Sequence, residues 1–205
     1  MRKPDGQIGL NCLIWLFTAM DIETDLLQAC IRKDRRAQHE LYKRCYGMMM
    51  AVCFRYEKNK EDAEFLLNQA FYKVLKNLHT YQSHVPFEAW IRRITINTAI
   101  DEYRKSQRSK LDYVDTPEQQ SPLQALDYNE ADKKYNAEEL LALVKKLPPI
   151  SQKVFNLYVI DGYNHKEIAE KLDMSEGTSK WHLSNSRKKL KKLLQDLMKN
   201  VSVLL

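Results

Sequence analysis

Apolar and polar positions alternate with the spacing of α-helices from residue 21 almost to the C-terminus. The clearest stretch is residues 61–78, where an apolar stripe faces a polar side. The stripe consists of Leu67, Ala70, Phe71, Val74, Leu75 and Leu78. Two further helices are expected within residues 21–56, on either side of the charged stretch 32–36, and another over residues 86–104. Because each apolar stripe must be buried, the pattern predicts helices packed on one another.

The pattern is interrupted and then resumes. Residues 106–133 contain two prolines, paired glutamines and a mild acidic excess, which is typical of a flexible linker. Beyond it, helices are expected over residues 135–147 and 150–160, with Gly162 ending the second. We predict an all-α protein in which two small helical domains are joined by a flexible linker. The divisions are an N-terminal extension at 1–20, a first domain at 21–106, a linker at 107–133 and a second domain at 134–200.

Residues 164–192 predict a short helix, a tight turn and a second helix. Asn164 and Glu167 have the spacing of a capping box, and Ser175 suits the N-cap of the second helix. Asp173, Met174 and Ser175 form the predicted turn. The second helix has an apolar stripe at Leu183, Leu190, Leu193 and Leu197. The second domain is therefore expected to end in a helix-turn-helix.

The outer face of that last helix is polar and basic. It carries Trp181, Asn185, Lys188 and Lys192, with Lys180 and Ser184 on its flanks, and residues 180–192 include six Lys or Arg and no acid. Helix-turn-helix proteins enter the major groove with such a face. The alternative is a solvated amphipathic helix at the end of a bundle.

The helix over residues 86–104 begins with Pro86, which suits a first helical turn. Its apolar side is formed by Phe87, Trp90, Ile91 and Ile94, and its polar side by Arg92, Arg93, Asn97, Asp101 and Arg104. Cations beside amides and aromatic rings suit single-stranded nucleic acid, because arginine follows phosphates and amides read exposed base edges. In the alternative interpretation Trp90 belongs to the core and the arginines face water.

Charge and cysteine content narrow the class of protein. The 205 residues carry a formal charge of +6, with a pI of about 9.0, which favours an anionic partner such as nucleic acid or a membrane surface. The four cysteines form no CxxC pair, which favours buried reduced thiols while leaving a redox switch open. No glycine-rich phosphate loop, HExxH motif or nucleophile elbow is present. We expect no enzyme, no cofactor and no metal site.

The first 19 residues differ from the rest of the chain. Arg2 and Lys3 precede an apolar run at residues 8–17, which is shorter than the roughly 20 residues that span a bilayer. The run fits a weak signal peptide, or an upstream start assignment with Met20 as the natural start. We favour Met20, because secretion would separate the protein from DNA.

With these pieces in order, residues 21–194 resemble the extracytoplasmic-function (ECF) sigma factors of bacterial RNA polymerase. Three stretches carry the resemblance: EDAEFLLNQAFYKVLKNL at 61, FEAWIRRITINTAIDEYRK at 87, and LPPISQKVFNLYVIDGYNHKEIAEKLDMSEGTSKWHLSNSRKKLKKLL at 147. The resemblance implies a cytoplasmic transcription initiation factor whose partners are core RNA polymerase, promoter DNA and an anti-sigma factor. The polymerase, with its magnesium, would perform the catalysis.

The resemblance also assigns site residues. The residues that it implies in polymerase binding are Asp62, Glu64, Asn68, Gln69 and Lys73. Contact with the melted minus-ten element falls to Arg92, Arg93, Asn97, Thr98, Asp101 and Arg104, of which Arg93, Asn97 and Thr98 lie at or near the pocket for a flipped base. Contact with the minus-thirty-five element falls to Thr178, Lys180, Trp181, Ser184, Asn185 and Lys188.

Five positions depart from the usual pattern of these sigma factors. Phe65 stands where an acid is frequent, and Asn68 and Gln69 replace a Gln-Glu pair, so the polymerase-binding face is less acidic. Trp181 replaces a small residue and Asn185 a basic one, which predicts an altered upstream element, since asparagine favours adenine and arginine favours guanine. Two rival functions are a two-domain transcription regulator that binds duplex DNA without polymerase, and a membrane-associated adaptor.

Overall fold

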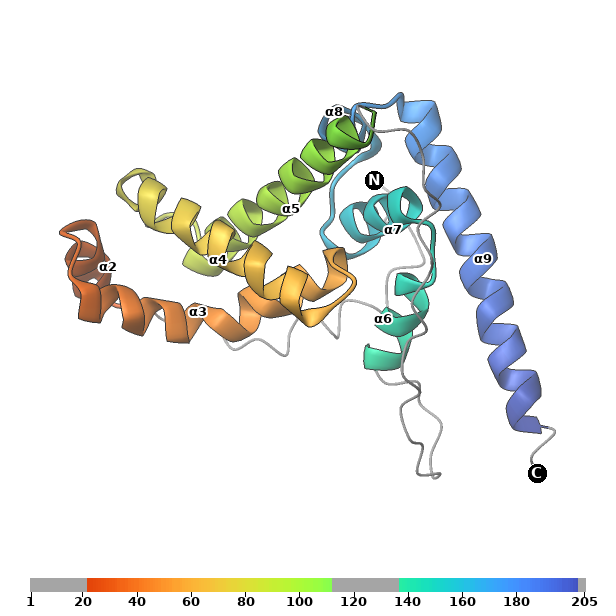
Figure 1. Cartoon of the computed structure of the whole chain (residues 1–205), viewed down its shortest axis with the longest axis horizontal. Helices are drawn as coiled ribbons and strands as arrows, with labels where there is room; N and C mark the ends of the chain where they lie inside the picture. The colour runs from red at the N-terminus through yellow and green to blue at the C-terminus, as the bar shows by residue number, and fades with distance from the viewer. Residues whose placement is uncertain (1–21, 112–136, 203–205) are drawn as a thin grey trace, which may run out of the picture.

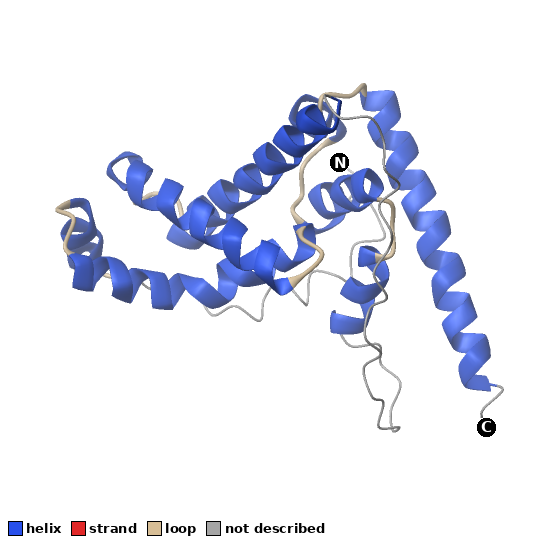
Figure 2. Ribbon diagram, viewed as in Figure 1, coloured by secondary structure: helices blue, strands red, loops and turns tan. Residues whose placement is uncertain are grey.

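The computed structural model describes residues 22–111 and 137–202, and all the regular structure in these two segments is helical (Figures 1 and 2). This confirms the predicted all-α fold. The expectations for residues 1–19 and for most of the linker lie outside the described residues. No helix in the described part of the chain is long and apolar enough to cross a bilayer.

The first domain contains α2 (Thr24–Ile31), α3 (Arg35–Tyr56), α4 (Lys60–Asn77), the short 3₁₀ helix η1 (Leu78–Thr80) and α5 (Phe87–Leu111). The predicted break between the first two helices is present at residues 32–34, where Lys33 has a positive φ of 65°. Asp34 then caps α3 by accepting hydrogen bonds from two backbone N–H groups. Asn59 caps α4, because its side-chain oxygen accepts a hydrogen bond from the backbone N–H of Asp62.

The core of the first domain is formed by the apolar stripes of α3, α4 and α5, which pack on one another. The three consecutive methionines at 48–50 are all buried, as expected for core residues. Trp90 is half-buried and packs against Tyr81 and Phe87, with ring centroids 5.3 and 5.7 Å away. These side chains hold the start of α5 against Tyr81, the residue that follows η1.

The second domain contains α6 (Ala137–Lys145), α7 (Pro149–Phe155), a π-helical turn η2 (Asn156–Ile160), α8 (His165–Leu172) and α9 (Glu176–Ser202). Gly162 follows with φ +78°, a backbone conformation that favours glycine, and it separates η2 from α8. α9 lies along α7 and α8 and continues beyond them towards the C-terminus (Figure 1). The predicted small bundle ending in a helix-turn-helix is confirmed.

Two boundaries differ from the sequence prediction. The sequence predicts that the linker begins at residue 107, but α5 continues to Leu111. Residues 105–111 include no glycine or proline, so nothing in this segment ends the helix that begins at Phe87. The single helix predicted over residues 150–160 widens into η2 after Phe155.

The two domains touch, which the sequence did not predict. α8 lies beside the C-terminal half of α5 (Figure 1), and α7 and η2 meet the C-terminal end of α3 through polar side chains. The domains are therefore packed on one another instead of being separated by the linker.

Candidate nucleic-acid and polymerase interface

The helix-turn-helix is built from local hydrogen bonds that the sequence predicted. The Asn164–Glu167 capping box is complete, with both reciprocal bonds at 2.8–2.9 Å. Asp173 ends α8 with φ 52°, and Oγ of Ser175 accepts a 3.0 Å hydrogen bond from the backbone N–H of Thr178. These caps fix where each helix begins and ends, and therefore how the second helix is presented.

Two histidine–serine contacts lock the helices of this domain together. Nδ1 of His165 on α8 lies 2.9 Å from Oγ of Ser179 on α9, and Nδ1 of His182 on α9 lies 2.9 Å from Oγ of Ser151 on α7. Both serines are buried. Burial also lowers the pKa of both imidazoles, so neutral histidine is the form that suits the packed domain.

The outer face of α9 is free to meet a partner. All six side chains assigned to the minus-thirty-five element are exposed: Thr178, Lys180, Trp181, Ser184, Asn185 and Lys188. Trp181 is 60% exposed, although an indole of this size is usually covered. Lys180 is only loosely paired with Glu176 at 3.9 Å. The structure thus brings the predicted set together on one face, opposite the buried Leu183.

The polar face of α5 carries the residues assigned to the minus-ten element, and several already have partners. Arg92 pairs with Glu88 at 3.2 Å, and Asp101 pairs with Lys73 of α4 at 3.0 Å. Asn97 accepts a 2.6 Å hydrogen bond from Lys171, and Arg104 donates to the backbone carbonyl of Glu170. Arg93 is exposed.

Thr98 does not lie on that face. Its side chain is fully buried, at 0% exposure, and its hydroxyl donates a 2.8 Å hydrogen bond to the carbonyl of Ile94 one turn earlier. At a helical spacing of about 100° per residue, Thr98 turns away from Asn97 towards the core. In this structure it cannot touch DNA directly, which corrects its assignment as a DNA-contacting residue.

The outer face of α4 combines the predicted polymerase-binding residues with two exposed aromatic rings. Asp62 and Asn68 are exposed, while Glu64, Gln69 and Lys73 are half-buried. Phe65 and Tyr72 are 61% and 68% exposed, and their spacing of seven residues puts them on one side of the helix. From the sequence, Phe65 is predicted only as a departure from the family pattern and Tyr72 is not predicted to be functional, although their spacing of seven residues is visible in the chain.

The cysteines of the described region are unsuited to chemistry in the folded protein. Cys30, Cys45 and Cys53 are all buried. Burial raises the pKa of both Cys45 and Cys53 to about 12, so the reactive thiolate is scarce near neutral pH. Within residues 22–111 and 137–202, no group of three His, Cys, Asp or Glu side chains has the arrangement of a metal site.

Two packed helical domains, the second presenting a capped helix-turn-helix with an exposed basic face, define a class of DNA-binding transcription factor. The Sigma-70 region 2 family matches residues 41–109, and the Sigma-70 region 4 family matches residues 137–190. Together these matches cover more than half of the chain, in the order and positions of the two domains.

Curated relatives agree. The ECF RNA polymerase sigma factor SigE of Mycolicibacterium smegmatis is 28% identical over 76% of this chain and 60% of its own length. SigM of Mycobacterium tuberculosis is 24% identical over 88% of this chain and 89% of its own length. SigW of Bacillus subtilis is 29% identical over 71% of this chain and 82% of its own length. The fold resembles that of sigma factor RpoE of Bartonella quintana, which was solved with the anti-sigma factor NepR. The TM-score is 0.51 and the sequence identity 17%, and the match covers 77% of this chain and 96% of the RpoE chain. The chain belongs to the sigma-70 family of RNA polymerase sigma factors, in its extracytoplasmic-function group.

Proposed function

We propose that this sigma factor directs RNA polymerase to its promoters with a division of labour between the two domains. Residues 21–106 bind core polymerase and open the minus-ten element, residues 107–133 connect the domains, and residues 134–200 bind the minus-thirty-five element. The observation that carries this proposal is the presence of regions 2 and 4 in order, with the basic face of α9 exposed.

Recognising duplex promoter DNA and opening it are physically different tasks. On α9, Lys180 and Lys188 supply salt-dependent attraction to phosphates, while Trp181, Ser184 and Asn185 supply sequence choice. On α5, Asn97 is proposed to read a base after it has left the stack. Flipping a base costs a few kcal/mol, so hydrogen bonds from a shaped surface must offset that cost.

The α4 face is proposed as the polymerase-docking surface. Its acids are fewer than the family pattern suggests, and Phe65 and Tyr72 offer exposed aromatic area instead. Exposed rings of this kind supply much of the affinity in protein interfaces when a partner covers them. The mixture of Asp62, Glu64 and two rings therefore suits a polymerase surface that is both basic and apolar.

The chain itself is proposed to perform no bond chemistry, so RNA synthesis belongs to the polymerase. We further propose that the protein acts in the bacterial cytoplasm, where polymerase and promoter DNA are found, and that an anti-sigma factor controls it. The last proposal is supported by the fold shared with RpoE of Bartonella quintana, which was solved with such a partner.

A run-off transcription assay with core polymerase from the same source tests the function. We expect a promoter-dependent transcript that requires both the chain and core polymerase. Tight binding of the free chain to duplex DNA without any such transcript would instead support a helix-turn-helix regulator that works without polymerase.

A further inference from the structure

A buried ion pair joins the two domains at the end of α3. Oδ1 of Asp161, just after η2, lies 2.7 Å from Nη2 of Arg55, and Oδ2 accepts a 2.7 Å hydrogen bond from the hydroxyl of Tyr56. The Asp161 side chain is 0% exposed and that of Arg55 is 11% exposed. Because a buried carboxylate is costly without partners, Asp161 depends on the first domain for its environment.

The same junction caps α3. The backbone carbonyl of Arg55 lies in the last turn, where helical carbonyls have no partner within the helix. It accepts hydrogen bonds from Nε2 of Gln152 at 2.9 Å and from Nδ2 of Asn156 at 2.6 Å. The second domain therefore completes the end of a first-domain helix. We call Arg55, Tyr56, Asp161, Gln152 and Asn156 the latch.

A second contact lies on α5. Lys171 of α8 donates to Oδ1 of Asn97, and Arg104 donates to the carbonyl of Glu170. Between the two contacts, Nζ of Lys153 lies 4.4 Å from the ring centroid of Tyr103. We call the four residues Asn97, Arg104, Glu170 and Lys171 the mask, because Asn97 and Arg104 are assigned to the minus-ten contact.

We propose that the free sigma factor is autoinhibited by this domain contact: the latch holds α8 on α5, and the mask occupies the groups that would read melted DNA. The inference rests on the proposed minus-ten role of Asn97 and Arg104. Lys171 already occupies one acceptor position of Asn97, and α8 lies against this part of α5. The two domains must therefore separate before a flipped base can reach Asn97.

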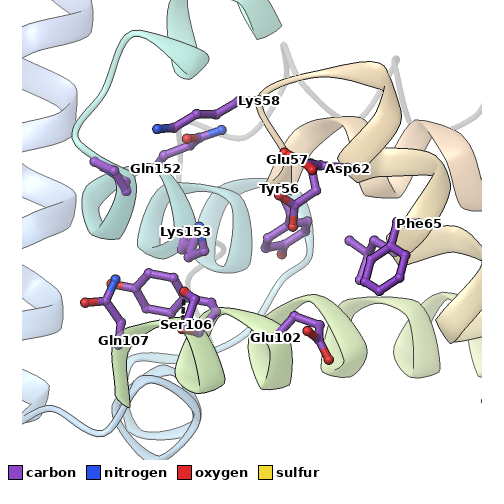
Figure 3. Close-up of a pocket in the computed structure, with 13 residues that line it drawn as sticks. Tyr56, Glu57, Lys58, Asp62, Phe65, Glu102, Ser106, Gln107, Gln152 and Lys153 are labelled. Atoms are coloured by element: carbon purple, nitrogen blue, oxygen red, sulfur yellow. Dashed lines mark hydrogen bonds between the residues drawn. The ribbon is translucent and has the colours of Figure 1, made fainter. Parts of the chain in front are cut away.

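The polymerase-docking face reaches the same junction. A cavity of about 370 Å³ between the domains is lined by Asp62 and Phe65 of α4 on one side and by Gln152 and Lys153 of α7 on the other (Figure 3). A polymerase surface seated on Asp62 and Phe65 would enter this cavity and meet α7. Polymerase binding and the closed arrangement therefore compete, which couples opening of the chain to capture by polymerase.

The latch can be tested without altering any residue assigned to DNA or polymerase. Asp161→Asn keeps the shape of the side chain but removes its charge, which leaves Arg55 buried without a counter-ion in the closed form and hydrated in the open form. Tyr56→Phe removes one hydroxyl. Glu40→Gln is the matched control, because it removes an exposed carboxylate that pairs within α3, with Lys43 and Arg44.

Small-angle scattering of the free full-length proteins measures closure without polymerase or DNA. We expect the radius of gyration to increase in Asp161→Asn and, less strongly, in Tyr56→Phe, while Glu40→Gln matches the unmodified chain. Circular dichroism checks that helix content is retained, and if Asp161→Asn loses helix, Tyr56→Phe decides the outcome. Unchanged radii in the folded latch variants would overturn the proposal.

Fluorescence anisotropy with short random-sequence single-stranded DNA tests the mask. Asp161→Asn should bind about tenfold more tightly than the unmodified chain, as expected if about a tenth of the free protein is open. Adding Asn97→Ala should remove most of that gain. Expansion without any gain in binding would overturn the masking role, whereas failure of the proposed function would appear separately, as absence of run-off transcript even with the unmodified chain.

Discussion

Lys171, in the last turn of α8, donates a 2.6 Å hydrogen bond to Oδ1 of Asn97 on α5, 74 residues earlier in the chain. Its ammonium also lies 4.9 Å from the ring centroid of Tyr163, and burial lowers the pKa of Lys171. A partly desolvated cation gains most from a nearby acceptor, which the Asn97 amide supplies. One hydrogen bond thus ties α8 of the second domain to the side chain proposed for promoter opening.

Replacement of Asn97 should separate promoter opening from polymerase binding. In Asn97→Ala we expect open-complex formation to weaken by about 1 kcal/mol or more, because a hydrogen bond to the flipped base is lost. Affinity for core polymerase should not fall, since the substitution also loosens the closed form. Potassium permanganate footprinting and a core-binding titration measure the two effects. Asn77→Ala, which removes an exposed amide at the end of α4, is the control. Equal loss in both assays would contradict the base-reading role.

Trp181 should matter for promoter choice and not for stability. Because its side chain is 60% exposed, Trp181→Ala is expected to change the free energy of unfolding by less than about 0.5 kcal/mol while weakening transcription from the cognate promoter. Leu183→Ala, on the buried side of the same helix, should cost about 2–5 kcal/mol. Urea denaturation and run-off transcription distinguish the two. A large stability loss in Trp181→Ala would show that the indole packs inside the protein.

Phe65 and Tyr72 should contribute to polymerase affinity. Both rings are mostly exposed in the free chain, so the double variant Phe65→Ser/Tyr72→Ser should fold normally. Its affinity for core polymerase should fall by about 2 kcal/mol or more if the rings are covered in the complex. Trp181→Ala, an exposed aromatic substitution in the other domain, should leave this affinity intact. Competition against a labelled sigma factor measures the change, and unaltered affinity of the double variant would place the docking face elsewhere.

Acid should destabilise the second domain through its histidines. Burial is the main cause that lowers the pKa of His165 and His182 below the ordinary value of 6.5, so the unfolded chain binds protons more readily. Their stabilising effect is present above pH 6.5 and is lost as the pH falls through 6.5 towards the lowered values. Thermal unfolding between about pH 7.5 and 5.5 measures the loss. The double variant His165→Gln/His182→Gln should show a weaker pH dependence, and an identical slope would contradict the assignment.

The buried thiols should be unreactive in the native state. With Cys12 replaced by serine, Ellman's reagent should react slowly with Cys30, Cys45 and Cys53 at neutral pH and quickly after denaturation, because burial raises the pKa of each of these thiols. Rapid disulfide formation in the folded protein under mild oxidant would instead support the redox switch that the sequence left open.

Local sequence determined most of the helices and both helix-turn-helix caps. The capping box at Asn164, the cap at Ser175 and the apolar stripe of α4 depend on residues a few positions apart, so their spacing is visible in the chain. The exposed face of α9 followed from the same periodicity. Helix ends were less certain: α5 passed the predicted boundary because no residue in its last turns opposes a helix.

Only the tertiary structure shows which polar side chains already have partners within the protein or are buried. Asp161 lies more than 100 residues after Arg55 and Tyr56 in sequence. Neither a charged residue at a helix end nor an acid after an apolar run indicates its partner. Thr98 shares the polar neighbourhood of Asn97 in sequence, but the direction of its side chain from α5 buries it. Periodicity determines the faces of a helix, whereas domain packing determines which of those faces remain free. The sequence by itself thus established two helical domains and their DNA-binding character, and only the fold showed that each domain covers part of the other.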